Sequence, residues 1–159
     1  MTHSLNRRLF LEDSMLAAAA SAMAAAPVAM AVDEKPTGSP MNKVRVAIIG
    51  CRIRGRAHAA ELAKVPDVEI IHVCDPDTDL SAELAGKIEK HAGKAPKQSQ
   101  DMRRIFEDKS VDAVFICTPN HWHSLAGIWA MQAGKDAYVE KPVSHNISEG
   151  RRLAQVARK

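Results

Sequence analysis

The sequence predicts an α/β fold with a doubly wound parallel sheet. Apolar runs rich in β-branched residues recur between residues 44 and 140, and segments with helical spacing separate them. The connections between the runs have the length of strand–helix–strand crossovers, which join parallel strands. The 159 residues are 46% hydrophobic with a net charge of +3, so this is an ordinary globular composition that indicates no nucleic-acid partner.

Two strands and two helices are expected in the first half of the chain. Glycine, proline and aspartate separate these segments and mark their ends. The expected elements begin with a strand at 44–49 that ends at Gly50, a helix from Gly55 to Lys64 and a strand at 68–74. The second helix is expected to begin on Asp77 or Thr78, to carry Leu80, Leu84 and Ile88 on one face, and to end at Gly93.

The second half continues the alternation. Residues 111–117 are an almost unbroken apolar run, as expected of a strand covered on both faces. A short edge strand at 95–99 and a brief helix capped by Asp101 are expected before this run, and a loop at 118–123 follows it. The next helix is expected to be capped by Asn120, to bury Leu125, Ile128 and Trp129, and to end before Gly134. A strand at 136–140 and a last helix complete the chain; the helix has an Asn146–Glu149 capping box and an inner stripe of Ile147, Leu153 and Val156.

Residues 1–31 differ in composition from the rest. Arg7 and Arg8 precede a weakly hydrophobic, alanine-rich run from Met15 to Ala31 that ends in Ala-Met-Ala, the order typical of a secretory signal. The paired arginines resemble the twin-arginine (Tat) class. The run is too short and alanine-rich for stable membrane insertion. We therefore expect an export signal at 1–31 that leads to the periplasm, a linker at 32–42 and one domain at 43–159.

The unusual polar clusters all follow predicted strands. They are residues 50–55, Asp75, residues 118–123 and residues 140–142. In an open parallel sheet, ligands bind at the carboxyl ends of the strands, so these clusters are expected to form one site.

The first cluster is two thirds of a dinucleotide fingerprint. Gly50 and Gly55 occupy the first and third positions of G-x-G-x-x-G, and Arg52 stands at the second. Asp75 follows Gly50 at an interval close to that of the acid which binds the ribose of NAD, and its charge disfavours the 2′-phosphate of NADP. The cluster therefore predicts a site for NAD.

Two other kinds of site fit poorly. A phosphate loop of the triphosphatase type would continue with lysine and a hydroxyl residue, where Arg56 and Ala57 stand. His121 and His123 have no nearby ligands that complete a metal site, so no metal is expected.

The three cysteines, each at the end of a predicted strand, are interpreted as small buried hydrophobic residues: Cys51, Cys74 and Cys117.

Four segments together resemble the Gfo/Idh/MocA oxidoreductases. They are the glycine turn, Cys-Asp-Pro-Asp at 74–77, Cys-Thr-Pro-Asn-His-Trp-His at 117–123 and Val-Glu-Lys-Pro at 139–142. Members of this family have an N-terminal Rossmann domain and a C-terminal α/β domain that holds the substrate. The resemblance covers residues 43–159, so we expect this chain to supply the Rossmann half, truncated before the substrate domain.

The resemblance also implies roles for individual residues. Lys141 would be the catalytic residue, reaching the substrate hydroxyl to hold negative charge or relay a proton. The cofactor would be bound by Gly50, Arg54 and Gly55 at the pyrophosphate, Asp75 at the adenosine ribose, Thr118, Asn120, His121 and His123 along the groove, and Glu140 and Lys141 at the nicotinamide ribose.

The implied activity is NAD-dependent hydride transfer at a carbinol carbon of a sugar or polyol, in a family that tends to form homo-oligomers. Two alternatives remain open. One is a glycosidase of the same fold, which oxidises its substrate transiently, eliminates, and recovers the hydride from retained NAD. The other is an inactive remnant that still has the dinucleotide-binding fold.

Overall fold

The computed structural model describes residues 43–159. The predicted export signal at 1–31 and linker at 32–42 lie outside the described residues. Within 43–159, no helix has both the length and the apolar character that crossing a bilayer requires.

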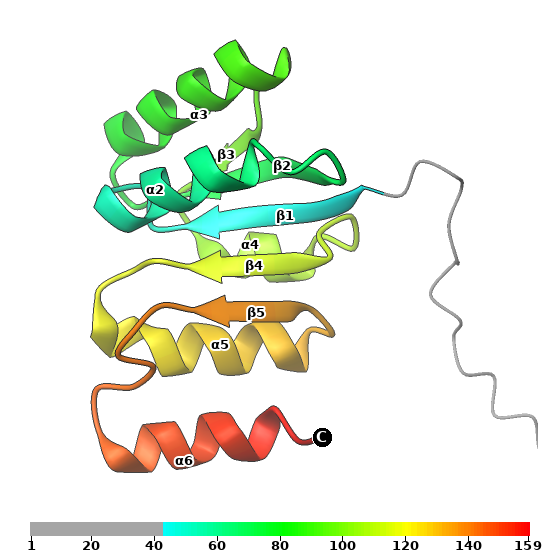
Figure 1. Cartoon of the computed structure of the whole chain (residues 1–159). Helices are drawn as coiled ribbons and strands as arrows, with labels where there is room; N and C mark the ends of the chain where they lie inside the picture. Colours follow the sequence, from blue (N-terminus) through cyan, green and yellow to red (C-terminus); the bar gives the residue numbers. More distant parts are fainter. Residues whose placement is uncertain (1–42) are drawn as a thin grey trace, which may run out of the picture. The chain divides into compact units, whose positions relative to one another are not determined.

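The described chain forms one parallel sheet of five strands in the order β3-β2-β1-β4-β5 (Figure 1). This order reverses direction between β1 and β4, which confirms the predicted doubly wound α/β fold of the Rossmann type. Ile49, the last residue of β1, pairs with Cys74 of β2 on one side and Ile116 of β4 on the other. The carboxyl ends of these three strands are therefore level. The strands are β1 (Val44–Ile49), β2 (Val68–Cys74), β3 (Lys97–Ser99), β4 (Ala113–Ile116) and β5 (Asp136–Val139).

Helices cover both faces of the sheet. Successive residues of β1 point to opposite faces. Val46 and Ile48 contact the core under α2 and α3, whereas Ala47 and Ile49 belong to the core that includes α4 and α5. Burial on both faces explains the continuous apolar runs of β1 and β4. The helices are α2 (Ile53–Leu62), α3 (Thr78–Ala92), α4 (Met102–Glu107), the 3-10 helix η1 (Asn120–Trp122), α5 (His123–Gln132) and α6 (Ile147–Val156).

Several predicted helix ends are confirmed. The side chain of Asp77 accepts hydrogen bonds from the first turn of α3, and Gly93 ends that helix with a φ of +74°. Asp101 caps α4, and Asn146 caps α6 by accepting from the backbone N–H of Glu149.

Two predicted helix starts are wrong. The helix α2 begins at Ile53, with Arg52 in the N-cap position, so Gly55 lies inside the first turn. Asn120 is not the cap of α5; it begins the 3-10 turn η1, and α5 starts at His123. The φ of −58° at Pro119 leads the chain into this tight turn immediately after β4.

Two side chains predicted to be buried are exposed: Leu125 by 39% and Ile147 by 78%. The helix α5 packs against the sheet through Ala126 and against α6 through Gly127, and Leu125 lies on neither of these contact faces. Ile147 is the first residue of α6, and the contact of this helix with α5 comes further along it, at Leu153.

Candidate functional site

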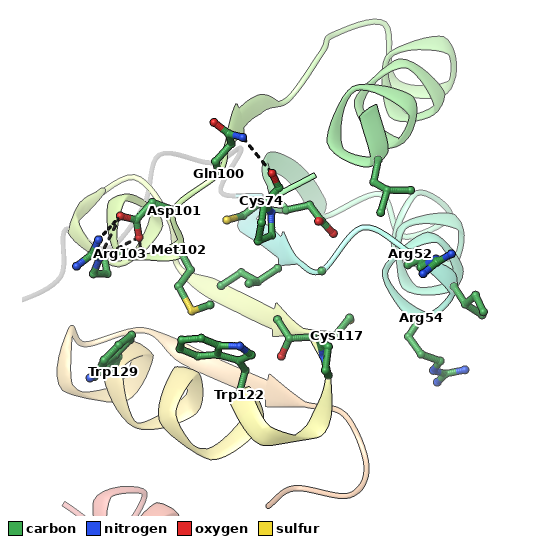
Figure 2. A pocket seen from close by; sticks show the side chains of 18 residues that line it. Arg52, Arg54, Cys74, Gln100, Asp101, Met102, Arg103, Cys117, Trp122 and Trp129 are labelled. Atoms are coloured by element: carbon green, nitrogen blue, oxygen red, sulfur yellow. Dashed lines mark hydrogen bonds and ion pairs between the residues drawn. The ribbon is translucent and has the colours of Figure 1, made fainter. Parts of the chain in front are cut away.

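A cavity of about 910 Å³ opens at the carboxyl ends of the strands (Figure 2). Its volume lies within the range of small-molecule and cofactor sites. The walls come from four connections that are distant in sequence, which is the convergence expected at this edge of the sheet. The connections contribute Gly50 and residues 52–54 after β1, Asp75 and Pro76 after β2, residues 100–103 after β3, and residues 117–119 after β4.

The turn after β1 requires glycine at its first and third fingerprint positions. Gly50 has a φ of +95°, and a Cβ there would lie 2.6 Å from the backbone of Cys117. A Cβ on Gly55 would lie 1.9 Å from the carbonyl oxygen of Gly50. Arg52 has a φ of −86°, which any residue adopts, so the backbone of this turn does not require glycine at the second position.

The amino terminus of α2 faces this turn without a side-chain cap. The first N–H groups of an α-helix have no partner within the helix, and they favour anionic ligands. Arg52, in the N-cap position, borders the cavity and is exposed. This end of α2 therefore suits a phosphate group.

Asp75 is fixed in orientation at the end of β2. One carboxylate oxygen accepts a hydrogen bond of 2.8 Å from the backbone N–H of Cys51, and the other accepts one of 3.0 Å from that of Asp77. The carboxylate lines the cavity and is half-buried. It has further lone pairs for a ligand hydroxyl.

Thr118 presents a polar atom that has no partner among the described residues. Its hydroxyl oxygen is buried and makes no hydrogen bond, and the residue lines the cavity. Buried polar groups almost always have a partner, so this hydroxyl marks a position where a polar ligand atom fits.

The other predicted groove residues lie outside the cavity wall. His123 is 2% exposed, and its ring nitrogens lie 2.7 Å from the carbonyl oxygens of Thr118 and Pro142. A neutral imidazole has one N–H group, so it can donate a hydrogen bond to one of these two oxygens and is in contact with the other. His121 is exposed beside Trp122, and Asn120 is half-buried in η1. Trp122, which was not among the predicted groove residues, borders the cavity.

The buried carboxylate of Glu140 forms a charge cluster with the exposed Arg54 and with His58, which the sequence did not indicate. One oxygen of Glu140 accepts from Arg54 at 2.5 and 3.0 Å and lies 2.6 Å from Nε2 of His58. The hydrogen bonds from Arg54 and then His58 lower the pKa of Glu140 to about 2. Arg54 borders the cavity but directs its guanidinium to Glu140, away from Arg52 (Figure 2).

Lys141 is exposed in the connection between β5 and α6, at the same edge of the sheet. Its backbone N–H lies 3.2 Å from a carboxylate oxygen of Glu140. Lys141 is not among the residues that line the cavity, and it directly follows Glu140 in the chain.

Sequence reasoning missed most of the apolar wall. It is formed by residues that look like ordinary helix-core positions: Leu80, Met102 and Trp129.

Cys74 and Cys117 also line the cavity, and they are free thiols like Cys51. Burial raises the pKa of all three to about 12. In the part of the chain from 43 to 159, no three potential metal ligands gather into a site.

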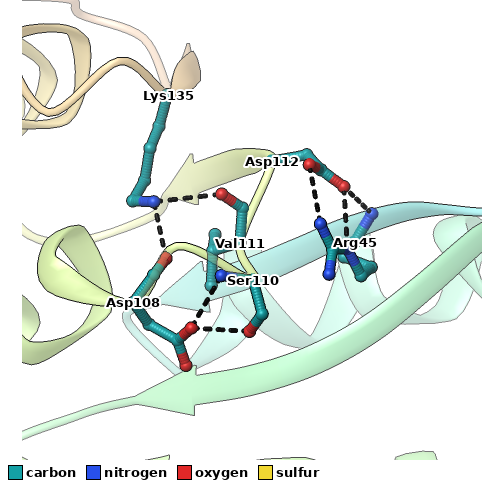
Figure 3. Close-up of polar contacts among 6 residues, drawn as sticks. All are labelled: Arg45, Asp108, Ser110, Val111, Asp112 and Lys135. Carbon is teal, nitrogen blue, oxygen red and sulfur yellow. Dashed lines mark hydrogen bonds and ion pairs between the residues drawn. The ribbon is translucent and has the colours of Figure 1, made fainter. Parts of the chain in front are cut away.

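A polar network at the opposite edge of the sheet holds the strands in register (Figure 3). Asp112 accepts hydrogen bonds from the backbone and guanidinium of Arg45, which joins β1 to β4. The ammonium of Lys135 donates to the carbonyl oxygens of Asp108 and Val111 at 2.7 and 3.0 Å, which joins β5 to the same turn. This network fixes the amino ends of the strands and so keeps their carboxyl ends level around the cavity.

The fold and the cavity define a dinucleotide-binding α/β domain. Residues 44–159 match the GFO_IDH_MocA family, described as an oxidoreductase family with an NAD-binding Rossmann fold. The chain belongs to this family, and its cofactor is NAD. The glycine turn, Asp75 and the unpartnered hydroxyl of Thr118 fit that cofactor.

Curated relatives carry the name glycosyl hydrolase family 109 protein. One from Akkermansia muciniphila is 34% identical over 113 residues, which cover 69% of this chain and 24% of the relative. One from Shewanella pealeana is 32% identical over 160 residues, covering 91% and 35%. The chain therefore spans a quarter to a third of the length of these relatives.

Solved structures of similar fold include one that was crystallised with NAD and one that is named as a dehydrogenase. GenD2 from gentamicin A biosynthesis, crystallised with NAD, has a TM-score of 0.67 at 27% identity and covers 77% of this chain. The myo-inositol 2-dehydrogenase of Lactobacillus plantarum has a TM-score of 0.66 at 25% identity and covers 73%. This chain corresponds to 34% and 33% of those two chains.

Proposed function

We propose that this chain is the NAD-binding part of an enzyme that oxidises a carbinol carbon of a sugar or polyol. The observation that carries the proposal is the convergence of the glycine turn, Asp75 and Thr118 on one cavity at the switch point of the sheet. Bound NAD supplies a hydride acceptor for such a reaction. The whole activity also needs a substrate pocket, which we propose lies in the part of the relatives that this chain does not span.

The residues at the cavity have separate tasks. Asp75 accepts hydrogen bonds from the adenosine ribose, and its charge repels a 2′-phosphate. The uncapped end of α2 receives the pyrophosphate. The hydroxyl of Thr118 acquires its missing partner from the cofactor.

Lys141 is proposed as the residue that contacts substrate. Oxidation of an alcohol removes a hydride from carbon and a proton from oxygen. A lysine in its ammonium form stabilises the developing negative charge on that oxygen; alternatively, a lysine in its neutral amine form accepts the proton. The exposed side chain of Lys141 at the carboxyl edge of the sheet suits this task.

A second candidate function is an NAD-dependent glycosidase. The curated relatives at 31–34% identity that are named glycosyl hydrolase family 109 favour it. Both candidates begin with the same oxidation, so the site residues keep the same tasks. The glycosidase recovers its NAD within each turnover, whereas the dehydrogenase releases NADH.

NAD binding by the purified chain tests the shared part of the proposal. We expect calorimetric binding of NAD and a rise in melting temperature, with weaker binding of NADP. Absence of both effects would favour the inactive remnant. With the complete enzyme, nitrophenol release from a nitrophenyl glycoside without net NADH would identify the glycosidase.

We also propose that the protein is exported through the twin-arginine route. Arg7, Arg8 and the alanine-rich run to Ala31 support this. Cell fractionation should find the processed protein in the periplasm, and the double change Arg7→Lys and Arg8→Lys should retain the precursor in the cytoplasm. Unchanged processing of the variant would argue against this route.

A further inference from the structure

The connection that carries Lys141 is attached to α2 on one side. Glu140, which precedes the lysine, is 4% exposed, and its carboxylate is held by Arg54 and His58. The His58 ring also contacts Phe115 and Tyr138, at centroid distances of 5.5 and 5.1 Å. These ring contacts restrict the imidazole, so the carboxylate has a rigid partner.

The same connection is attached to α5 on the other side. Nδ1 of His123 lies 2.7 Å from the carbonyl oxygen of Pro142. The hydroxyl of Ser124 donates a hydrogen bond of 3.0 Å to the carbonyl oxygen of Val143. His123 and Ser124 are 2% and 1% exposed. The two carbonyl groups after Lys141 therefore contact buried side chains in the first turn of α5.

We propose that Arg54, His58, His123 and Ser124 form a clamp that positions Lys141 for the nicotinamide half of the cofactor. This inference rests on the function proposed above. The backbone on either side of Lys141 is held by these contacts, and the lysine side chain is exposed to solvent. Holding a catalytic group in place before the ligand arrives lowers the entropy that binding and reaction must lose.

The clamp also links this connection to the cavity. Through its second ring nitrogen, His123 contacts the carbonyl oxygen of Thr118, whose hydroxyl lacks a partner at the cavity wall. His123 therefore joins the ends of β4 and β5 at the site. It acts on the cofactor through Thr118 and Lys141, as a positioning residue.

Two conservative variants weaken the clamp from opposite sides. Ser124→Ala removes the hydroxyl that holds Val143. His58→Phe removes the contact with Glu140 and keeps an aromatic ring against Phe115 and Tyr138. Ser81→Ala is the matched control, because Ser81 is 2% exposed and its hydroxyl donates to the carbonyl oxygen of Thr78, far along the chain from this connection.

Backbone hydrogen exchange of residues 140–146, measured by mass spectrometry, tests the clamp without any ligand. We expect both variants to exchange this segment roughly fivefold faster, the change that loss of one ordinary hydrogen bond allows. Ser81→Ala should leave it unchanged. Unchanged exchange in both variants would overturn the clamp, whether or not the chain binds NAD.

Binding of NAD and of ADP then tests the positioning role, since ADP lacks the nicotinamide riboside. We expect Ser124→Ala and His58→Phe to weaken NAD roughly fivefold and to leave ADP unchanged. Equal weakening of both ligands, or of neither, would overturn the role for Lys141. If the unaltered chain binds NAD no more tightly than ADP, the nicotinamide half contributes no affinity and the positioning role fails. If it binds neither ligand, the proposed function itself fails.

Discussion

The carboxylate of Asp75, at the end of β2, accepts a hydrogen bond of 2.8 Å from the backbone N–H of Cys51, in the turn after β1. The glycine turn and the predicted ribose-binding acid are therefore one structural unit. A carboxylate held in this way keeps its orientation and can accept a further hydrogen bond from a ribose hydroxyl.

Replacing Asp75 with alanine should weaken NAD binding at least ~10-fold, because a hydrogen bond to a charged acceptor contributes about 1.5–3 kcal/mol. The preference for NAD over NADP should also shrink, because the repulsion of the 2′-phosphate is lost. Calorimetry with both cofactors measures these changes. Asp79→Ala, an exposed acid in the first turn of α3, is the control. An unchanged NAD dissociation constant would contradict the ribose assignment.

Arg52→Gly should weaken NAD binding roughly three- to tenfold at low salt. Among residues 43–159, Arg52 has no ion pair, whereas Arg54 pairs with Glu140 and Arg56 with Glu83. Arg52 is thus available for the pyrophosphate. Adenosine binding should not change, and neither should NAD binding in the control Arg152→Gln on α6. Tighter NAD binding by the glycine variant would show that the arginine obstructs the cofactor.

Gly55→Ala should destabilise the domain by about 3 kcal/mol, because the new methyl group would overlap the carbonyl oxygen of Gly50. Gly86→Ala is the opposite case. Gly86 lies within α3 with no atom within 4 Å of the added methyl group, so alanine should stabilise the helix by about 0.5–1 kcal/mol. Urea unfolding measures both. Similar free energies of unfolding for the two variants would contradict the packing of α2 on the turn.

Glu140 should stabilise the fold most strongly at neutral pH. Its pKa is lowered from 4.5 to about 2, so its contribution is complete above 4.5 and is lost as the pH falls toward 2. Glu140→Gln has no such titration. The difference in unfolding free energy between the original chain and this variant should therefore shrink below pH 4.5. A difference that stays constant from about pH 7 to about pH 2.5 would contradict the ionised cluster.

The three cysteines should react slowly with iodoacetamide in the folded protein. Burial raises the pKa of each thiol to about 12, and the thiolate is the reactive form. In urea, all three should be labelled rapidly, which mass spectrometry can follow. Rapid labelling of Cys117 in the native protein, the one cysteine that is only half-buried, would show that this strand end opens to solvent.

The sequence predicted the strands and the edge where the site lies. The central strands β1, β2 and β4 are short apolar runs with turn residues on both sides, and this pattern follows from burial on two faces. The position of Asp75 followed from the end of β2, and the need for glycine at 50 and 55 followed from the fingerprint. These features depend on local composition, which a single sequence contains.

The tertiary structure decided what the polar side chains contact. Arg54 was expected at the pyrophosphate, and it pairs with Glu140, 86 residues further along the chain. His58 gave no signal, because a histidine on a helix face becomes part of a site only when β5 lies beside it. His123 was expected along the cofactor groove, and it is buried between the carbonyl oxygens of two connections.

By itself, then, the sequence determined the parallel α/β fold, the edge of the sheet where the cavity lies and NAD as the cofactor. It did so because strand patterns, glycine turns and an acid after β2 are local features, and their spacing along the chain indicates the fold and the cofactor. Only the tertiary structure decided which arginine is free at the cavity, which side chains hold the connection around Lys141 and which hydroxyl lacks a partner. Those outcomes depend on distances between residues that are far apart in sequence, and packing of the sheet sets these distances.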